Sequence, residues 1–158
     1  MAIQKTNAMR ILDKNKVSYE VITYDISDDK IDGVSVAKKT GQDVKEVYKT
    51  LVTQGTSREF FVFVIPVAEE LDLKKAAKAA GEKKVEMIHV KDITKYTGYI
   101  RGGCSPVGMK KLYKTFIQEQ AKELENICVS GGKKGIQVKL TPEDLIKVIN
   151  GSFVDIIH

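Results

Sequence analysis

The sequence predicts an α/β fold of the α+β kind, with a mixed, barrel-like β-sheet core and helices packed on it, in a single domain over residues 1–158. Three observations predict this class. A chain of 158 residues has the usual length of one domain, and no repeat or low-complexity linker divides it. Segments with apolar residues at helical spacing interleave with segments that alternate as strands do. Two strand-like segments flank a short turn, so at least one strand pair is antiparallel.

The first part of the chain predicts a helix, a strand and a second helix. Apolar residues at positions 8, 9, 11 and 12 lie at helical spacing, and Thr6 or Asn7 is available as the cap. Val17–Tyr24 alternates as a strand does. After a polar turn, Ser35–Lys39 is predicted to be a short helix that ends at Gly41.

A β-hairpin follows in the middle of the chain. Thr50–Thr53 and Phe60–Ile65 are rich in strand-forming residues, and they flank a turn at Gly55–Ser57. The second run is apolar on both faces, which predicts a buried central strand.

The remaining elements have recognisable ends. Asp72–Ala80 is rich in alanine and lysine and stops at Gly81, as helices do. Thr141, followed by a proline and two acidic residues, opens a helix that Asn150–Gly151 ends. Further strands are predicted over Val85–Val90 and Phe153–Ile157.

Composition narrows the classes of function. No apolar stretch approaches the roughly 20 residues that cross a bilayer, and the N-terminus lacks a secretory apolar region, so we expect a cytoplasmic protein without a membrane partner. The net charge of +5 suits a polyanionic partner, although ordinary enzymes carry as much. Two cysteines and two histidines form neither a disulfide framework nor a zinc site, and both standard nucleotide-binding glycine motifs are missing. We therefore expect no metal and no cofactor.

Two glycine-rich stretches, Thr97–Gly108 and Ser130–Gly135, are candidates for binding an anion or a carbonyl oxygen. Adjacent glycines permit positive φ angles and let backbone N–H groups converge on such an oxygen. Tight turns are the alternative, since glycine pairs are ordinary turn chemistry.

Three side chains are candidates for chemistry, each with a plainer alternative. Lys49 stands at a strand start, where its ammonium could hold a phosphate or a carbonyl oxygen, or simply be solvated. Tyr24 ends a strand and could offer its phenol to a pocket, or pack. Cys104 follows two glycines whose amides could lower its thiol pKa, or it is a small buried residue. No pattern of paired carboxylates, of Ser-His-Asp or of Cys-His stands out.

Four segments occur in an order and spacing typical of one family: Val47–Leu51, Leu73–Ala77, Thr97–Gly108 and Val129–Gly135. Together they resemble the YbaK/EbsC family of aminoacyl-tRNA deacylases, which are related to the editing domain of bacterial prolyl-tRNA synthetase. The resemblance covers nearly the whole chain. It implies the fold of such an editing domain.

The resemblance implies an enzyme, a trans-editing deacylase that clears the Cys-tRNA(Pro) formed when prolyl-tRNA synthetase attaches cysteine. Cysteine and proline are too close in size for one pocket to separate them by the ~10⁴-fold that translation needs, so a second site acts afterwards. The implied mechanism uses the substrate's own thiol, which attacks the ester and leaves as a thiolactone. The implied partners are cysteine-charged tRNA(Pro) and prolyl-tRNA synthetase.

The resemblance also implies the site residues. Lys49 takes the position of the central functional residue, and Tyr24, Thr50 and Gly102 map onto the pocket. We hypothesise that Lys49 contacts the terminal adenosine or the aminoacyl group, and that the N–H groups of Gly102 and Gly103 stabilise the oxyanion. Gln137 stands where the family is often acidic, and Asp32 where an aromatic residue often precedes Gly33. The predicted catalytic residues are Lys49 and Gly102; the predicted binding residues are Tyr24, Thr50, Gly103, Ser130, Gly131 and Gly132; Gln137 and Cys104 are further candidates.

Three alternatives stay open. The same fold could deacylate Ala-tRNA(Pro) or Ser-tRNA with water as the nucleophile. The protein could instead be a non-catalytic module that binds tRNA or a synthetase. Cys104 could act as a nucleophile, in which case its replacement by serine abolishes turnover.

Overall fold

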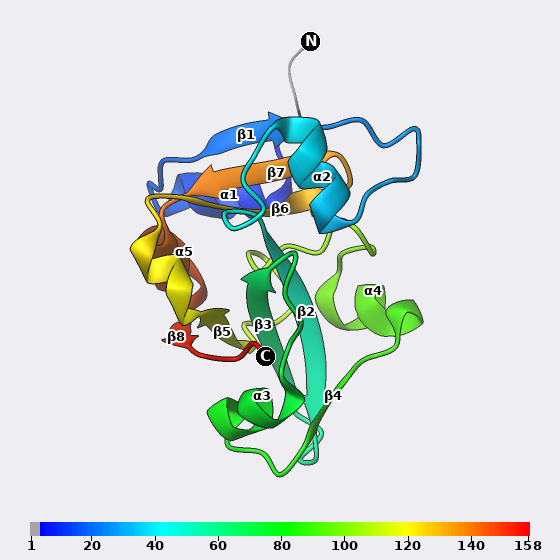
Figure 1. The fold of residues 1–158 in the computed structure, drawn as a ribbon, viewed down its shortest axis with the longest axis vertical. Coiled ribbons are helices and arrows are strands. Elements are labelled where there is room, and N and C mark those ends of the chain that lie inside the picture. Colours follow the sequence, from blue (N-terminus) through cyan, green and yellow to red (C-terminus); the bar gives the residue numbers. More distant parts are fainter. Residues whose placement is uncertain (1–3) are drawn as a thin grey trace.

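Two β-sheets organise the fold of the computed structural model, which describes residues 4–158 (Figure 1). The smaller sheet is antiparallel, in the order β1 (Glu20–Thr23), β7 (Ile136–Leu140) and β6 (Ile127–Lys133). The larger sheet has the order β4 (Val85–Met87), β2 (Tyr48–Gly55), β3 (Phe60–Pro66), β5 (Lys114–Gln118) and β8 (Ser152–Val154). It is mixed, because β2 runs antiparallel to β3 and β4 whereas β5 runs parallel to β3 and β8.

Side-chain caps encoded in the sequence set the helix ends. The α-helices within residues 4–158 are α1 (Asn7–Lys14), α2 (Gly33–Thr40), α3 (Leu73–Ala80), α4 (Ile93–Thr97) and α5 (Pro142–Ile149). The side chains of Thr6, Asp32, Asp72 and Thr141 accept backbone N–H groups of α1, α2, α3 and α5. Gly41 and Gly81 end α2 and α3 with φ angles of 69° and 72°, which glycine adopts without strain.

The small sheet is covered on both faces. Successive side chains of a strand point to opposite faces. Val129 of β6 therefore packs in one cluster with Met9 of α1, whereas the adjacent Cys128 packs in another with Ala37 of α2. Figure 1 shows α2 in front of this sheet and α1 behind it.

The two sheets meet where β2 begins. Val47, just before β2, forms an isolated parallel bridge with Cys128, and the Cys128 N–H donates to the carbonyl oxygen of Glu46 at 2.8 Å. On its other side, Val47 accepts the N–H of Val67 at 2.9 Å. These contacts place the start of β2 beside the small sheet and α2, where the candidate site lies.

The structure confirms the predicted fold class, the predicted helices and the hairpin. Residues 61–65 of β3 are at most 3% exposed and occupy the middle of the larger sheet, as the doubly apolar run predicts. The predicted strands Val17–Tyr24 and Val85–Val90 are longer than the observed β1 (Glu20–Thr23) and β4 (Val85–Met87), which end where their pairing with β7 and β2 ends. The predicted strand Phe153–Ile157 is shifted, because β8 pairs with β5 over Ser152–Val154 and so begins one residue earlier and ends three residues earlier. The expected mixed sheet is two sheets, of which one is mixed.

The second glycine-rich stretch is only in part a turn. Ser130–Lys133 belongs to β6, whose pairing with β7 is irregular between Ser130 and Lys133. Of this stretch, only Lys134 and Gly135 lie outside the strands, and they form the turn between β6 and β7. Within residues 4–158, no helix combines the length and apolar character that crossing a bilayer requires.

Candidate active site

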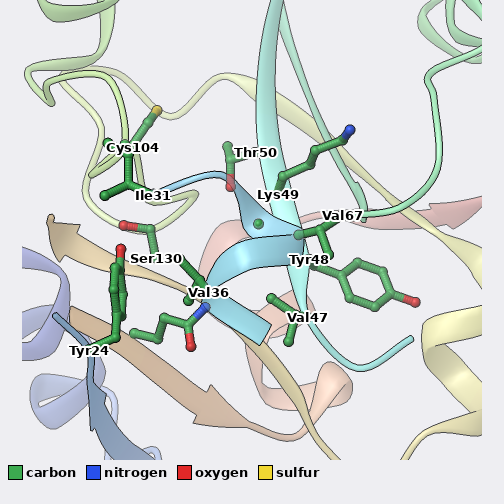
Figure 2. Close-up of a pocket in the computed structure, with 13 residues that line it drawn as sticks. Tyr24, Ile31, Val36, Val47, Tyr48, Lys49, Thr50, Val67, Cys104 and Ser130 are labelled. Atoms are coloured by element: carbon green, nitrogen blue, oxygen red, sulfur yellow. The ribbon is translucent and has the colours of Figure 1, made fainter. Parts of the chain in front are cut away.

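A pocket of about 170 Å³ opens where the two sheets meet (Figure 2). It is surrounded by residues from the start of β2, from the first turn of α2, from strands β6 and β7 of the small sheet, and from the loop after α4. The lining residues are Tyr24, Ile31, Gly33, Val36, Val47, Tyr48, Lys49, Thr50, Val67, Gly102, Cys104, Ser130 and Gln137.

Lys49 carries the positive charge of this pocket. It is the second residue of β2, and Figure 2 shows its side chain extending to the side away from Cys104 and Tyr24. Burial lowers the pKa of the Lys49 ammonium, and the carboxylates of Glu70 and Glu69 partly oppose that shift. Within residues 4–158 it forms no ion pair and no hydrogen bond. A partly desolvated ammonium without a partner gains free energy when an oxygen ligand arrives.

Thr50 presents an unused hydroxyl on the opposite face of β2. Because side chains alternate along a strand, Thr50 shares its face with Tyr48 and Val52 and not with Lys49. Its Oγ1 atom is buried and has no hydrogen-bond partner within the described residues. A buried hydroxyl without a hydrogen-bond partner lowers the stability of the folded protein by about 1–3 kcal/mol. Its presence here is consistent with a ligand that completes its hydrogen bond.

The paired glycines after α4 have different roles. Gly102 lines the pocket with a φ angle of 83°, and a Cβ atom there would lie 2.8 Å from Cδ1 of Ile31. Gly103 does not line the pocket, and its N–H donates to the carbonyl oxygen of Ile100 at 3.0 Å. The expected pair of oxyanion donors is therefore reduced to Gly102, because the Gly103 N–H is already used within its turn.

Gly103 instead joins the two glycine-rich stretches. A Cβ atom on Gly103 would lie 3.0 Å from the backbone nitrogen of Lys134, so glycine permits a close approach of the two segments. Gly131 and Gly132 also lie outside the pocket lining. The carbonyl oxygen of Gly131 accepts the Thr6 hydroxyl at 2.6 Å. Gly132 has a φ angle of 100°.

The small sheet contributes polar groups to the pocket. Ser130 of β6 lies directly opposite Gln137 of β7, so both side chains point to the face that α2 covers. The Ser130 Oγ atom accepts the N–H of Gly132 at 3.2 Å, which leaves its own hydroxyl proton free to donate. Tyr24 follows the end of β1, and Figure 2 shows its phenol beside the Ser130 side chain.

Cys104 lines the pocket without the features of a nucleophile. Burial raises its thiol pKa to about 11, so the thiol stays protonated near neutral pH and is a poor nucleophile. We predict that Cys104→Ser changes the kcat of deacylation by less than about threefold, since a merely lining side chain contributes little. Single-turnover assays with both proteins measure this change. A loss of all turnover would instead identify Cys104 as the nucleophile.

The pocket lining is rich in hydrogen-bond donors and, among residues 4–158, contains no Asp, Glu or His. Lys49, Thr50, Ser130, Tyr24 and Gln137 can all donate, which suits the oxygens of an ester, a ribose or a phosphate. A general base of the carboxylate or imidazole kind is not part of this lining. The arrangement can bind and polarise an ester, and it leaves the nucleophile to come from elsewhere.

Seven of the ten predicted site residues line this one pocket, and Gly103, Gly131 and Gly132 do not. Reasoning from sequence missed the apolar wall of Ile31, Val36 and Val67, and also the part played by Gly33. A Cβ atom on Gly33 would lie 2.2 Å from Cγ1 of Val67, so glycine allows the start of α2 to pack closely against the residue that follows β3. A glycine directly after the Asp32 cap was the signal that could have indicated this close contact.

This chain belongs to the family of aminoacyl-tRNA editing domains, whose sequence pattern matches residues 32–148. A protein of Enterococcus faecalis named as a proposed Cys-tRNA(Pro)/Cys-tRNA(Cys) deacylase, EbsC, is 49% identical over 153 residues, which are 97% of this chain and 93% of that protein. The family resemblance found in the sequence is thereby confirmed.

Solved structures support the same fold. A crystal structure described as a proposed trans-editing enzyme for prolyl-tRNA synthetase has a TM-score of 0.82 at 20% identity, and the match covers 99% of each chain. The crystal structure of a hypothetical protein has a TM-score of 0.88 at 16% identity, covering 97% of this chain and all of that one. At such identities the likeness concerns the fold alone.

Proposed function

We propose that this protein is a trans-editing aminoacyl-tRNA deacylase that clears Cys-tRNA(Pro), with residues 1–158 acting as one editing domain. The observation that carries the proposal is the pocket of donors around Lys49 and Thr50, to whose lining the described part of the chain contributes no carboxylate or imidazole. The similarity to the Enterococcus faecalis protein, named for cysteinyl-tRNA deacylation, supports the choice of amino acid.

The substrate supplies the nucleophile in the proposed reaction. The sulfur of the esterified cysteine attacks its own carbonyl carbon, and a C–S bond forms while the C–O bond to the terminal ribose breaks. The thiol proton passes to the departing ribose oxygen, which leaves tRNA with a free 3′ end and a cysteine thiolactone that water later opens. Intramolecular attack has a very high effective concentration once its geometry is held.

The protein's own groups hold that geometry. The Lys49 ammonium binds an oxygen of the terminal adenosine or of the aminoacyl ester, and its charge stabilises the oxyanion as it forms. The Thr50 hydroxyl, the Gly102 backbone and the side chains of Tyr24 and Ser130 complete the binding site. We assign Lys49 and Gly102 to catalysis and the others to binding.

The reaction places the protein with the translation apparatus in the cytoplasm. Its net charge of +5 favours the tRNA backbone, and the single-stranded 3′ end is the part of tRNA that a small pocket can take in. One small domain has little surface with which to select tRNA(Pro) alone. We therefore propose that it acts together with prolyl-tRNA synthetase, which selects that tRNA.

A panel of aminoacyl-tRNAs tests the proposed function. Cysteinyl-, homocysteinyl-, seryl- and alanyl-tRNA(Pro) are each incubated with the protein, and the loss of the aminoacyl ester is timed against protein-free hydrolysis. We expect release of cysteine at least about 100-fold faster than release of serine or alanine, because only a thiol can attack internally. Equal release of serine would favour water as the nucleophile, and no release above the protein-free rate would favour a binding module.

A further inference from the structure

A chain of hydrogen bonds runs behind the pocket from Cys128 to Gln137. The Cys128 thiol donates to Oε1 of Gln42 at 2.6 Å, and Nε2 of Gln42 donates to Oε1 of Gln137 at 3.0 Å. The same Nε2 atom donates to Oγ1 of Thr40 at 2.6 Å. Gln42 lies outside the pocket lining, so the mechanism described above gives it no role.

The end of α2 fixes the direction of this chain. The Thr40 hydroxyl donates its proton to the carbonyl oxygen of Val36 at 2.9 Å, so its oxygen can only accept from Gln42. The Gln42 atom that faces Thr40 must therefore be the amide nitrogen. The left-handed Gly41 holds Gln42 in place, because it lets the Gln42 N–H reach the Ala37 carbonyl oxygen at 2.9 Å.

The orientation of Gln42 determines the orientation of Gln137. Since the Gln42 nitrogen donates to Gln137, the Gln137 atom that receives it is the carbonyl oxygen. The Gln137 NH₂ group then points away from Gln42. Gln137 is 6% exposed and lines the pocket, and within residues 4–158 its NH₂ group donates to no protein acceptor. The NH₂ group is therefore free to donate to a ligand in the pocket.

We infer that Gln42 is a positioning residue, which holds Gln137 so that its NH₂ group donates to the carbonyl oxygen of the aminoacyl ester. The inference rests on the proposed function. The ester carbonyl is the acceptor that we assign, because its oxygen gains negative charge as the thiol attacks and therefore gains most from a donor in the lining. At the other end of the hydrogen-bond chain, the Cys128 thiol holds the Gln42 carbonyl oxygen. Burial raises the pKa of this thiol to about 12, so the thiol keeps the proton that it donates.

A double-mutant cycle tests the link between the two glutamines. We expect Gln137→Leu to lower the kcat for Cys-tRNA(Pro) by at least about tenfold with little change in KM, because a donor to the developing oxyanion acts mainly in the transition state. We expect Gln42→Leu to lower kcat by about three- to tenfold, and the double variant to fall no further than Gln137→Leu. Effects that multiply in the double variant would overturn the inference, because Gln42 would then act without Gln137.

Two further variants separate positioning from stability. Gln118→Leu is the matched control, since Gln118 is a buried glutamine that donates to Asp155 at 3.0 Å and lies outside the pocket. It should lower Tm and leave kcat unchanged. If Gln42→Leu does not fold, Gln42→Glu keeps the shape and, as a carboxylate, cannot donate to Gln137. The same loss of kcat is then expected, and wild-type kcat would overturn the inference.

A binding measurement distinguishes this inference from the proposed function. The side-chain NH₂ signals of ¹⁵N-labelled protein are followed during titration with 3′-deoxy-3′-(cysteinylamino)adenosine, an amide analogue of the charged tRNA terminus. We expect the Gln137 signal to shift while that of Gln118 stays in place, and the Gln137 shift to be reduced in Gln42→Leu. An analogue that binds without moving the Gln137 signal overturns the inference alone. Wild-type protein that deacylates no tRNA overturns the proposed function.

Discussion

Lys49→Ala is expected to lower kcat/KM for Cys-tRNA(Pro) by about 10²–10³-fold, the usual effect of removing a principal oxyanion donor. Among the residues that the structure describes, Lys49 provides the one cationic side chain of the pocket lining, and its partial burial lowers the pKa of the ammonium. Since Lys49 forms no ion pair within residues 4–158, its removal should change Tm little. Single-turnover deacylation and thermal unfolding of the same samples measure both quantities.

Lys45→Ala is the matched control for that experiment. Lys45 is exposed and precedes β2 by three residues, so its loss removes the same charge from the same region without touching the pocket. We expect nearly wild-type kcat/KM at moderate salt, where surface charges are screened. Equal losses in the two variants would show that Lys49 acts only through overall charge. An unchanged rate in Lys49→Ala would show that the active site lies elsewhere.

Thr50→Val should make the protein more stable and less active. Valine has nearly the same shape as threonine but removes the buried hydroxyl that has no partner within the described residues. We expect the free energy of unfolding to rise by about 1 kcal/mol, because an unsatisfied polar group has been removed. We expect kcat/KM to fall by about tenfold or more, because the ligand loses a hydrogen bond inside the pocket. Denaturant titration and deacylation kinetics measure the two changes.

Thr53→Val, on the same strand, is the control, because we expect it to change the free energy of unfolding in the opposite direction. The Thr53 hydroxyl is also buried, but it donates to the Phe61 carbonyl oxygen at 3.1 Å. Its removal should lower the free energy of unfolding by about 1 kcal/mol and leave kcat/KM unchanged. If Thr50→Val is destabilised as Thr53→Val is, the Thr50 hydroxyl has an acceptor in the free protein and is not reserved for a ligand.

Local signals predicted most of the fold. The cap at Thr141, the end of α3 at Gly81 and the hairpin turn depend on residues close in sequence, so the sequence shows them directly. Strands β6 and β7 of the small sheet were not predicted, although β1 was, because the glycines of β6 break the strand pattern and β6 depends on pairing with β7. The division into two sheets depends on contacts between distant segments, such as the bridge from Val47 to Cys128.

The sequence predicted which residues form the candidate site better than how these residues are arranged. Family resemblance brought Tyr24, Lys49, Thr50 and Gly102 together, although spacing alone left each with a plainer alternative. The use of the Gly103 N–H within its own turn, and the hydrogen bond from Gln42 to Gln137, depend on three-dimensional contacts. No local pattern in the sequence encodes either of them.

The most direct measurement compares cysteinyl-tRNA(Pro) with 2-aminobutyryl-tRNA(Pro), in which a methyl group of similar size replaces the thiol. If the substrate's sulfur forms the new bond to the carbonyl carbon, the wild-type protein should cleave the second tRNA at least about 100-fold more slowly than the first, close to the rate without protein. Competition assays should show that both tRNAs bind with similar affinity. Cleavage of both at the same rate would contradict the account, because the nucleophile would then have to be water or a group of the protein.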